Sequence, residues 1–244
     1  MLPARTIVFE GIEHFLANLA SVPRNLQERC DDRDYGLSYE QELAKARVGD
    51  AALAFRANAL IDQIENVAFN TVGAIEENPH YFGHRPNISA VVTGQPKSMY
   101  RRTMTKQSNT SPINIYISRS VSYSYSPTQV LNRGIACVAL ALALKKIRPV
   151  YLYMCDYGQS CFHNYKMNIG FLLPIDINNV DLSITANMLA GVGFYRRLMF
   201  TALHSIAGGY HAGMELPSNS VSDIRRGFNL QETDFIIPGM LSSA

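Results

Sequence analysis

The segment from Asn78 to Cys155 contains no aspartate or glutamate. An even distribution of the acidic residues would place roughly six of them there. The remainder of the chain carries 12 basic and 20 acidic residues, so +10 and −8 give the net charge of +2. Because a surface selected only for solubility mixes both signs, this absence indicates an anionic partner, with nucleic acid as the best-supported class. The segment holds ten basic residues: Arg85, Lys97, Arg101, Arg102, Lys106, Arg119, Arg133, Lys145, Lys146 and Arg148.

The sequence also has few cysteines and lacks a long hydrophobic run. Its four cysteines form no CxxC pair, and the N-terminus does not resemble a signal peptide. The most apolar stretch, 134–144, is shorter than the roughly 20 residues of a membrane span and is followed directly by lysine. We therefore expect a reduced, cytoplasmic protein without a membrane segment. Apolar residues make up 47% of the chain, which is enough for a globular core.

The first 77 residues are acidic and have helical patterns. They hold 7 basic and 13 acidic residues, in contrast to the segment that follows. Apolar spacing predicts helices over 7–19 and 51–67, and the capping-box pattern from Ser38 to Gln41 opens another that runs to about Arg47. We expect an acidic helical region over 1–77 and a basic α/β body over 78–244, together forming one compact unit.

The body alternates strand and helix patterns. Strands are expected over 88–93, 113–117 and 150–154, with a polar loop or hairpin over 94–111. Pro127 begins a buried helix that ends at Lys145 and Lys146, so that residues 113–154 form a βαβ unit with parallel strands. A strand over 167–175, a helix over 194–206 and a strand over 235–237 follow. The predicted fold class is α/β: a mixed, largely parallel sheet flanked by helices, with a helical N-terminal extension.

Three basic pairs adjoin aromatic residues, at 100–102, 194–197 and 225–228. In grooves for single-stranded nucleic acid, cations track phosphates and aromatic faces stack on unpaired bases. For the second pair the alternative is that Phe194 and Tyr195 lie on the core face of an amphipathic helix. The candidate nucleic-acid-binding residues are Lys97, Tyr100, Arg101, Arg102, Lys106, Arg119, Tyr123, Tyr125, Arg196, Arg197, Arg225 and Arg226.

A serine-rich loop over 118–126 follows a strand and precedes a helix, which is where α/β sheets place ligand sites. This layout resembles the von Willebrand factor A-type domain, whose metal site opens with an Asp-x-Ser-x-Ser motif. The matching residues are Ser118, Ser120 and Ser122, so the metal-binding aspartate is absent and we expect no metal and no cofactor. The resemblance implies an alternative function, a metal-free module for protein–protein interaction.

Other chemistry-bearing residues give weaker patterns. His80 and His84 have the spacing of a zinc pair, but Pro79 and Gly83 disfavour a helix there. Asp156 and His163 leave open a hydrolase, although no nucleophile and base can be paired from their spacing. We expect a protein that is not an enzyme.

Three stretches, 9–11, 35–40 and 132–134, have the sequences Phe-Glu-Gly, Tyr-Gly-Leu-Ser-Tyr-Glu and Asn-Arg-Gly. With the acidic helical start and the basic body, they resemble the Drc-type single-stranded DNA-binding RNA polymerase cofactors of lytic podophages. The resemblance implies binding of unwound DNA at phage promoters, recruitment of a phage RNA polymerase and a location in the host cytoplasm. The leading hypothesis is a single-stranded DNA-binding protein, with DNA favoured over RNA as the partner and self-association left open.

Overall fold

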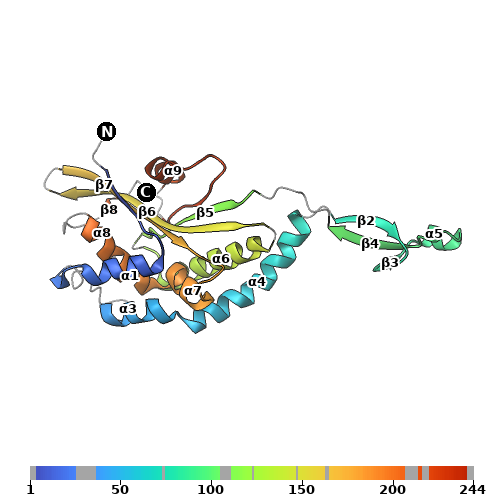
Figure 1. The fold of residues 1–244 in the computed structure, drawn as a ribbon, viewed down its shortest axis with the longest axis horizontal. Coiled ribbons are helices and arrows are strands. Elements are labelled where there is room, and N and C mark those ends of the chain that lie inside the picture. The colour runs from blue at the N-terminus through green and yellow to red at the C-terminus, as the bar shows by residue number, and fades with distance from the viewer. Residues whose placement is uncertain are drawn as a thin grey trace. The chain divides into compact units, whose positions relative to one another are not determined.

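The computed structural model describes residues 4–25, 37–72, 75–104, 111–122, 124–146, 148–162, 165–206, 214–215 and 220–240 (Figure 1). Its internal contacts divide the chain into two units, which we call the main unit and the small unit. The main unit comprises Met1–Ile61 and Ser111–Ala244, and the small unit comprises Asp62–Thr110. The boundaries between the units lie after Ile61 and after Thr110, whereas we expected a boundary between 77 and 78. They differ because the N-terminal residues contribute directly to the core of the main unit.

The main unit is built on a mixed sheet in the order β1-β7-β6-β5-β9, with β8 also paired to β6. Neighbouring pairs are parallel except β6 with β7 and β6 with β8. This arrangement confirms the predicted α/β class with a mixed, largely parallel sheet. The strands are β1 (Ala4–Val8), β5 (Ile113–Ser118), β6 (Val150–Phe162), β7 (Tyr165–Ile175), β8 (Met214–Glu215) and β9 (Phe235–Ile237).

The predicted βαβ unit is present, with helix α6 (Pro127–Lys145) joining the parallel strands β5 and β6. Ser126 begins α6 with a capping box, in which its hydroxyl accepts from the Gln129 amide and the Gln129 side chain accepts from the Ser126 amide. Proline is placed at the first turn, where it costs no hydrogen bond. Local signals therefore sufficed to predict this part of the fold.

Each face of the sheet has its own helices (Figure 1). Alternate strand residues such as Ile117, Met154 and Phe171 bury one face in the main core. Helices α1, α6, α7 and α8 pack against this core, and α9 (Val221–Phe228) covers part of the other face, where Ile224 lies against Tyr116 and Cys155. The bounds of the core helices are α1 (Ile12–Ser21), α7 (Leu182–Ala190) and α8 (Phe200–Ile206).

The N-terminal region differs from the purely helical extension that we expected. Ala4–Val8 forms an edge strand beside β7, and α1 begins only at Ile12. Helix α3 (Tyr39–Val48) has the predicted capping box, and α4 (Ala51–Val72) follows it. The helix expected over 7–19 was wrong at its start, because Ile7 pairs with Phe171 in the sheet register.

The small unit contains a three-stranded antiparallel sheet in the order β2-β4-β3 and one short helix. A strand was expected over 88–93, and the structure corrects this to helix α5 (Ile88–Val92). The Asn87 side chain accepts a hydrogen bond from the Ala90 amide at 3.3 Å, an N-cap that outweighs the β-propensity of the valines. The strands are β2 (Ile75–His80), β3 (Arg85–Pro86) and β4 (Met99–Met104).

The helix predicted over 194–206 forms in two parts. Phe194–Met199 is a π-helix, labelled η2, and α8 continues it. Helix α7, which lies directly before it, was not expected. Its start is capped by the Asp181 carboxylate, which accepts from the Ser183 amide at 2.6 Å.

Helix α6 is long and apolar enough to cross a membrane by length and composition, a test that core helices of soluble proteins also pass. In the structure it carries eight buried residues, among them Val130, Ile135 and Val138, and packs on α7 and β6. Its apolar character is therefore accounted for by packing inside the main unit.

We predict that Gly134→Ala destabilises the main unit, because α6 and α7 touch at this glycine. A Cβ atom there would lie 2.1 Å from the Leu189 carbonyl oxygen and 2.3 Å from the Ala190 Cα, both backbone atoms. We expect the free energy of unfolding in urea to fall by about 2 kcal/mol. The control is Gly11→Ala, since no atom lies within 4 Å of its Cβ position. Equal effects of the two substitutions would refute this close helix contact.

Candidate nucleic-acid interface and the buried polar cluster

The first Arg-aromatic pair lies in β4 of the small unit. Tyr100 is half-buried and faces Arg85 across the strand pair, with the guanidinium carbon 4.8 Å from the ring centroid. Arg101 is exposed and, as the next strand residue, lies on the opposite sheet face. Lys97 is exposed too, and its ammonium is 5.9 Å from the ring centroid of Tyr81. The small unit thus combines cations with aromatic rings on its surface.

The turn after β2 exposes two aromatic side chains of the small unit. Tyr81 is 55% exposed and Phe82 is 76% exposed. Unpaired bases can stack on aromatic rings presented in this way. The register places Asn78 opposite Arg101 and Glu77 opposite Arg102, so the acid-free part of this sheet begins beside Arg101. The side chain of Arg102 and the whole of Lys106 lie outside the described residues.

The second Arg-aromatic pair is mostly internal to the main unit. Tyr195 and Arg197 are buried in η2, so Arg197 does not present its charge to a ligand on the surface. Arg196 is partly exposed and lies over two rings, 5.4 Å from the centroid of Tyr195 and 5.6 Å from that of Phe200. This geometry agrees with the alternative reading in which Tyr195 belongs to the core face.

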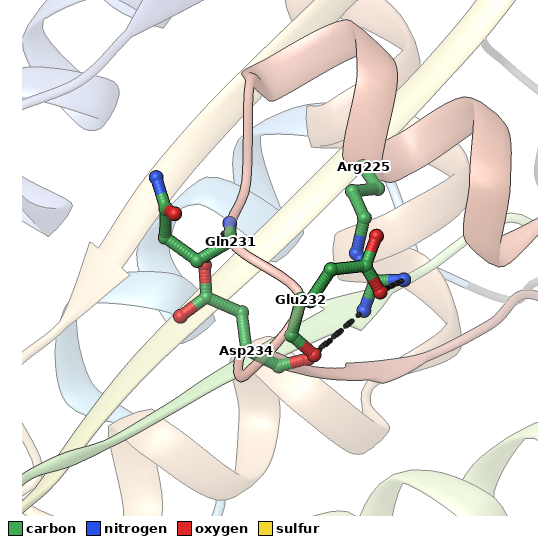
Figure 2. A network of polar contacts seen from close by, with 4 residues as sticks. All are labelled: Arg225, Gln231, Glu232 and Asp234. Carbon is green, nitrogen blue, oxygen red and sulfur yellow. Dashed lines mark hydrogen bonds and ion pairs between the residues drawn. The ribbon is translucent and has the colours of Figure 1, made fainter.

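The third Arg-aromatic pair, on α9, lies beside carboxylates. Figure 2 shows Arg225 reaching over the following turn, where it pairs with the Glu232 carboxylate at 3.0 Å and donates to the Asp234 carbonyl. The same turn is closed by the Gln231 amide, which donates to the Asp234 carboxylate at 2.7 Å. Arg226 pairs with Asp223 at 2.6 Å. These contacts offset the charges of Arg225 and Arg226 locally. Arg225 also links α9 to the turn that precedes β9.

Most basic residues of the main unit that come from the acid-free segment bind backbone carbonyls. Arg133 donates to the carbonyls of Ser118 and Pro238, Lys145 to that of Ile177 at 2.8 Å, and Arg148 to that of Ser111 at 2.9 Å. Carbonyl oxygens accept from cations without any carboxylate nearby. The lack of acid between 111 and 155 is therefore explained largely by structural roles, and the evidence for an anionic partner concentrates in the small unit.

Arg119 lies in the interior and not in an exposed loop. Its guanidinium donates to the carbonyls of Leu189 and Gly191, where α7 ends, and lies 5.5 Å from the ring centroid of Tyr195. A charge held in this way does not reach a phosphate at the surface. In the same loop Tyr125 is half-buried against the core, and Tyr123 lies outside the described residues.

Arg119 belongs to a buried polar cluster at the carboxyl ends of β5 and β6. There the Asp156 carboxylate accepts hydrogen bonds from the Ser120 hydroxyl and from the Tyr157 amide, the latter at 3.0 Å. The Tyr195 hydroxyl accepts from the Val121 amide at 3.2 Å. This is the expected ligand position of an α/β sheet, but here the protein's own side chains fill it.

Burial shifts the pKa values of the ionisable groups in this cluster. Burial raises the pKa of Asp156 to about 6, although the hydrogen bonds from Ser120 and Tyr157 and the charge of Arg119 act in the other direction. Burial, together with the nearby Arg133, lowers the pKa of Arg119 to about 10, so its guanidinium remains charged at neutral pH. Burial also raises the pKa of Tyr195, which keeps the phenol protonated.

Sequence reasoning named Asp156 as a candidate residue of a hydrolase but missed its pairing with Ser120. The signal was available in principle, because residues at the carboxyl ends of two adjacent parallel strands meet at one sheet edge. Among the residues that the structure describes, no group of three or more histidine, cysteine, aspartate or glutamate side chains forms a metal site. His163, the partner considered for a hydrolase, falls outside them.

The chain belongs to a family described as "Domain of unknown function (DUF7192)", whose model matches residues 3–243. No curated protein and no solved structure matches the chain significantly.

We predict that Asp156→Asn removes a pH dependence of stability. The pKa of this carboxyl is raised from 3.8 to about 6 on folding, so the native state binds more protons than the unfolded state between about pH 4 and 6. The free energy of unfolding of the unsubstituted protein should therefore fall as pH rises through this window, by about 2–3 kcal/mol from this group. The asparagine variant should lack this fall, as measured by urea unfolding at a series of pH values.

The control for this prediction is Asp50→Asn, because the pKa of Asp50 is shifted in the opposite direction. Burial acts to raise the pKa of Asp50, but the Lys45 ammonium and the Leu53 amide outweigh it, so the pKa is lowered. Asp50 should therefore contribute stability at neutral pH that is lost as the pH falls through its pKa. A stability difference between the unsubstituted protein and Asp156→Asn that is the same at every pH would contradict the assignment of a buried, shifted carboxyl.

Proposed function

We propose that this member of the family binds single-stranded nucleic acid, with DNA as the first candidate, through the small unit. The observation that carries the proposal is that the small unit exposes two rings, Tyr81 and Phe82, and three cations in a stretch without acids. The cations are Arg85, Lys97 and Arg101, of which Arg101 lies on the sheet face opposite to Tyr100. Phosphates would contact the cations, and unpaired bases would stack on the rings. Stabilising opened duplex, and recruiting a phage RNA polymerase to it, are the finer parts of the same proposal.

The structure narrows the residues on which this proposal rests. Arg119, Arg197 and Arg225 are held inside the main unit or by its carbonyls and carboxylates, so we leave them out of the interface. Among the described side chains, no ion pair links Lys97 or Arg101 to a carboxylate. These two cations can therefore contact phosphate without first breaking an ion pair with a described carboxylate, although the Lys97 ammonium lies 5.9 Å from the ring centroid of Tyr81.

A second candidate function is a metal-free interaction module that uses the serine loop. Its support is the fixed backbone of this loop, in which the Ser122 amide donates to the Met240 carbonyl at 2.7 Å and the Met240 amide to the Ser120 carbonyl at 2.8 Å. Ser124 is exposed beside Ser122. A protein partner that is retained with excess polyanion and lost on Ser122→Ala/Ser124→Ala would favour this function over nucleic-acid binding.

We predict that Arg101→Ala/Arg102→Ala weakens binding to oligonucleotides of any sequence. If both arginines contact phosphates, the slope of log affinity against log salt should become shallower by about 0.7 for each. Fluorescence anisotropy with labelled single strands and duplexes at several salt concentrations measures both quantities. The control is Arg226→Ala, whose charge is paired with Asp223, and it should bind as the unsubstituted protein does. Unchanged affinity and salt slope in the double variant would refute the site.

We predict separately that Phe82→Ala weakens binding to single strands more than to duplex. Loss of one stacked base costs roughly 1–3 kcal/mol, which is about 5- to 150-fold in affinity, whereas paired bases leave no face for the ring. The matched control is Phe55→Ala on α4, since both phenylalanines are 76% exposed. An equal loss for the two variants, or an equal loss on single strand and duplex, would argue against base stacking at this turn.

A further inference from the structure

Helix α5 exposes an aliphatic face that nucleic-acid binding does not explain. Ile88, Val91 and Val92 are 67%, 53% and 79% exposed, and their spacing places them on one side of the helix. Ala90 is buried within the small unit and fixes which side faces outward. Aliphatic side chains do not stack on bases, so this face needs a partner with apolar surface.

The charged residues that flank this face in the acid-free segment are positive. Arg85 and Lys97 flank α5 in the chain, and both are exposed. The Asn87 amide donates to the Ser98 carbonyl at 2.9 Å and the Gln95 amide to the Ala90 carbonyl at 2.8 Å, which ties the helix to the strand that follows it. The α5 face is therefore an apolar ridge with cations beside it, and its complement is an apolar pocket with acidic residues at its rim.

The main unit has such a pocket where α1 begins beside the end of β7. It has a volume of about 350 Å³, and Ile175 and Met188 supply buried apolar lining. Glu10, Glu13 and Asp176 are exposed around it. The volume lies within the range of specific binding pockets.

The charge at this rim is predominantly negative. Hydrogen bonds from Asn179 and Asn178 lower the pKa of Asp176, which keeps it ionised. His14 also lines the pocket, and its Nδ1 accepts from the Glu10 amide at 3.2 Å. Lys145 lies near Asp176 and donates to the Ile177 carbonyl, so it offsets one of the three carboxylates.

A second pocket of about 290 Å³ adjoins the first and shares Pro174, Ile175 and Asp176 with it. Tyr151, which is 54% exposed, lies in its wall. The apolar surface therefore extends beyond one pocket along this end of the sheet. An apolar surface of this kind can receive the i, i+3 and i+4 side chains of a short helix, the usual mode of helix-in-groove recognition.

We propose that the α5 face of one copy of this protein docks into the Glu10–Glu13–Asp176 pocket of a second copy. Both surfaces belong to the same chain, and they match in apolar character and in the sign of their charges. Because the two surfaces are different, the contact is heterologous: each copy has a free pocket and a free helix, so copies join head to tail into open chains or rings. The proposal does not depend on nucleic-acid binding. Arg85 and Lys97 belong to both surfaces, but the side chains substituted to test the two proposals are different.

The test measures self-assembly without nucleic acid, by sedimentation velocity and light scattering over a range of protein concentrations. The unsubstituted protein should form particles of more than two chains as concentration rises. The helix variant Ile88→Asp/Val92→Asp and the pocket variant Glu10→Lys/Glu13→Lys should each associate about tenfold or more weakly. An equal mixture of the two variants should form particles of two chains, because it contains one intact helix and one intact pocket for each pair.

Two controls are matched to these variants. Val48→Asp introduces the same charge at a valine that is 76% exposed on α3, and Glu40→Lys reverses a glutamate in the first turn of α3 as Glu13→Lys does in α1. Both controls should assemble as the unsubstituted protein does. All substituted positions are exposed, so the variants should keep their fold, which circular dichroism checks.

A cross-linking experiment gives an independent reading. Val92→Cys and Glu13→Cys in the same chain should yield, after mild oxidation, a ladder of disulfide-linked chains, whereas either substitution alone should not. A protein that stays monomeric at all concentrations, a mixture of variants that does not associate, or a link that forms only within one chain would overturn the proposal. Nucleic-acid binding is measured in separate assays on Arg101, Arg102 and Phe82, so the failure of one proposal is distinguishable from the failure of the other.

Discussion

The architecture of the main unit depends on the buried guanidinium of Arg119. It is placed at the carboxyl end of β5 and donates to the carbonyls of Leu189 and Gly191, thereby joining the central sheet to the end of α7. Burying a charge costs less when hydrogen bonds satisfy most of its donors and an opposite charge is near. Both terminal nitrogens of Arg119 donate to carbonyls, and its buried Nε has no hydrogen-bond partner among the described residues. Asp156, on the adjacent strand, supplies the opposite charge and is held in turn by Ser120. The last residue of β5 and the first residues of the loop after it, 118–121, are therefore buried and connect the sheet to α7 and η2.

The burial of Arg119 changes how the acid-free basic segment is interpreted, because some of its cations have structural roles. Inside the main unit the cations of 111–155 end helices and close loops by donating to backbone carbonyls, as Arg133, Lys145 and Arg148 show. In the small unit Lys97 and Arg101 lie on the surface instead, and Lys97 lies beside the exposed ring of Tyr81. The basic residues of the acid-free segment thus have two physical roles. In the main unit most of them bind backbone carbonyls, and in the small unit the exposed ones belong to the proposed binding surface.

Local signals in the sequence predicted much of the fold. The capping boxes at Ser38 and Ser126 and the apolar spacing of α6 gave correct helices, and the strand–helix–strand order gave the parallel pair β5 and β6. Prediction failed where tertiary contacts outweigh local preference. The first strand pairs with β7, although its sequence continues a helical pattern, and the N-cap of Asn87 turns a β-branched run into α5.

The candidate site was less predictable than the fold, for a geometric reason. Residues adjacent in sequence were grouped as Arg-aromatic pairs, but adjacent positions on a strand face opposite sides, and adjacent positions on a helix can be buried or exposed. Tyr195 and Arg196 illustrate the second case, since the first is buried and the second is partly exposed. Neither the interior position of Arg119 nor the carboxylate partner of Arg225 could be read from sequence separation, because both depend on chain segments that meet only in the folded protein.

The central claim is that nucleic acid contacts the small unit. Photo-cross-linking of a bromodeoxyuridine-substituted single strand, followed by mass spectrometry of the linked peptides, locates the contact directly. The account predicts links to peptides that contain Tyr81, Phe82 or Tyr100. Links confined to peptides of the main unit, or the absence of any link under conditions where the oligonucleotide is bound, would contradict it.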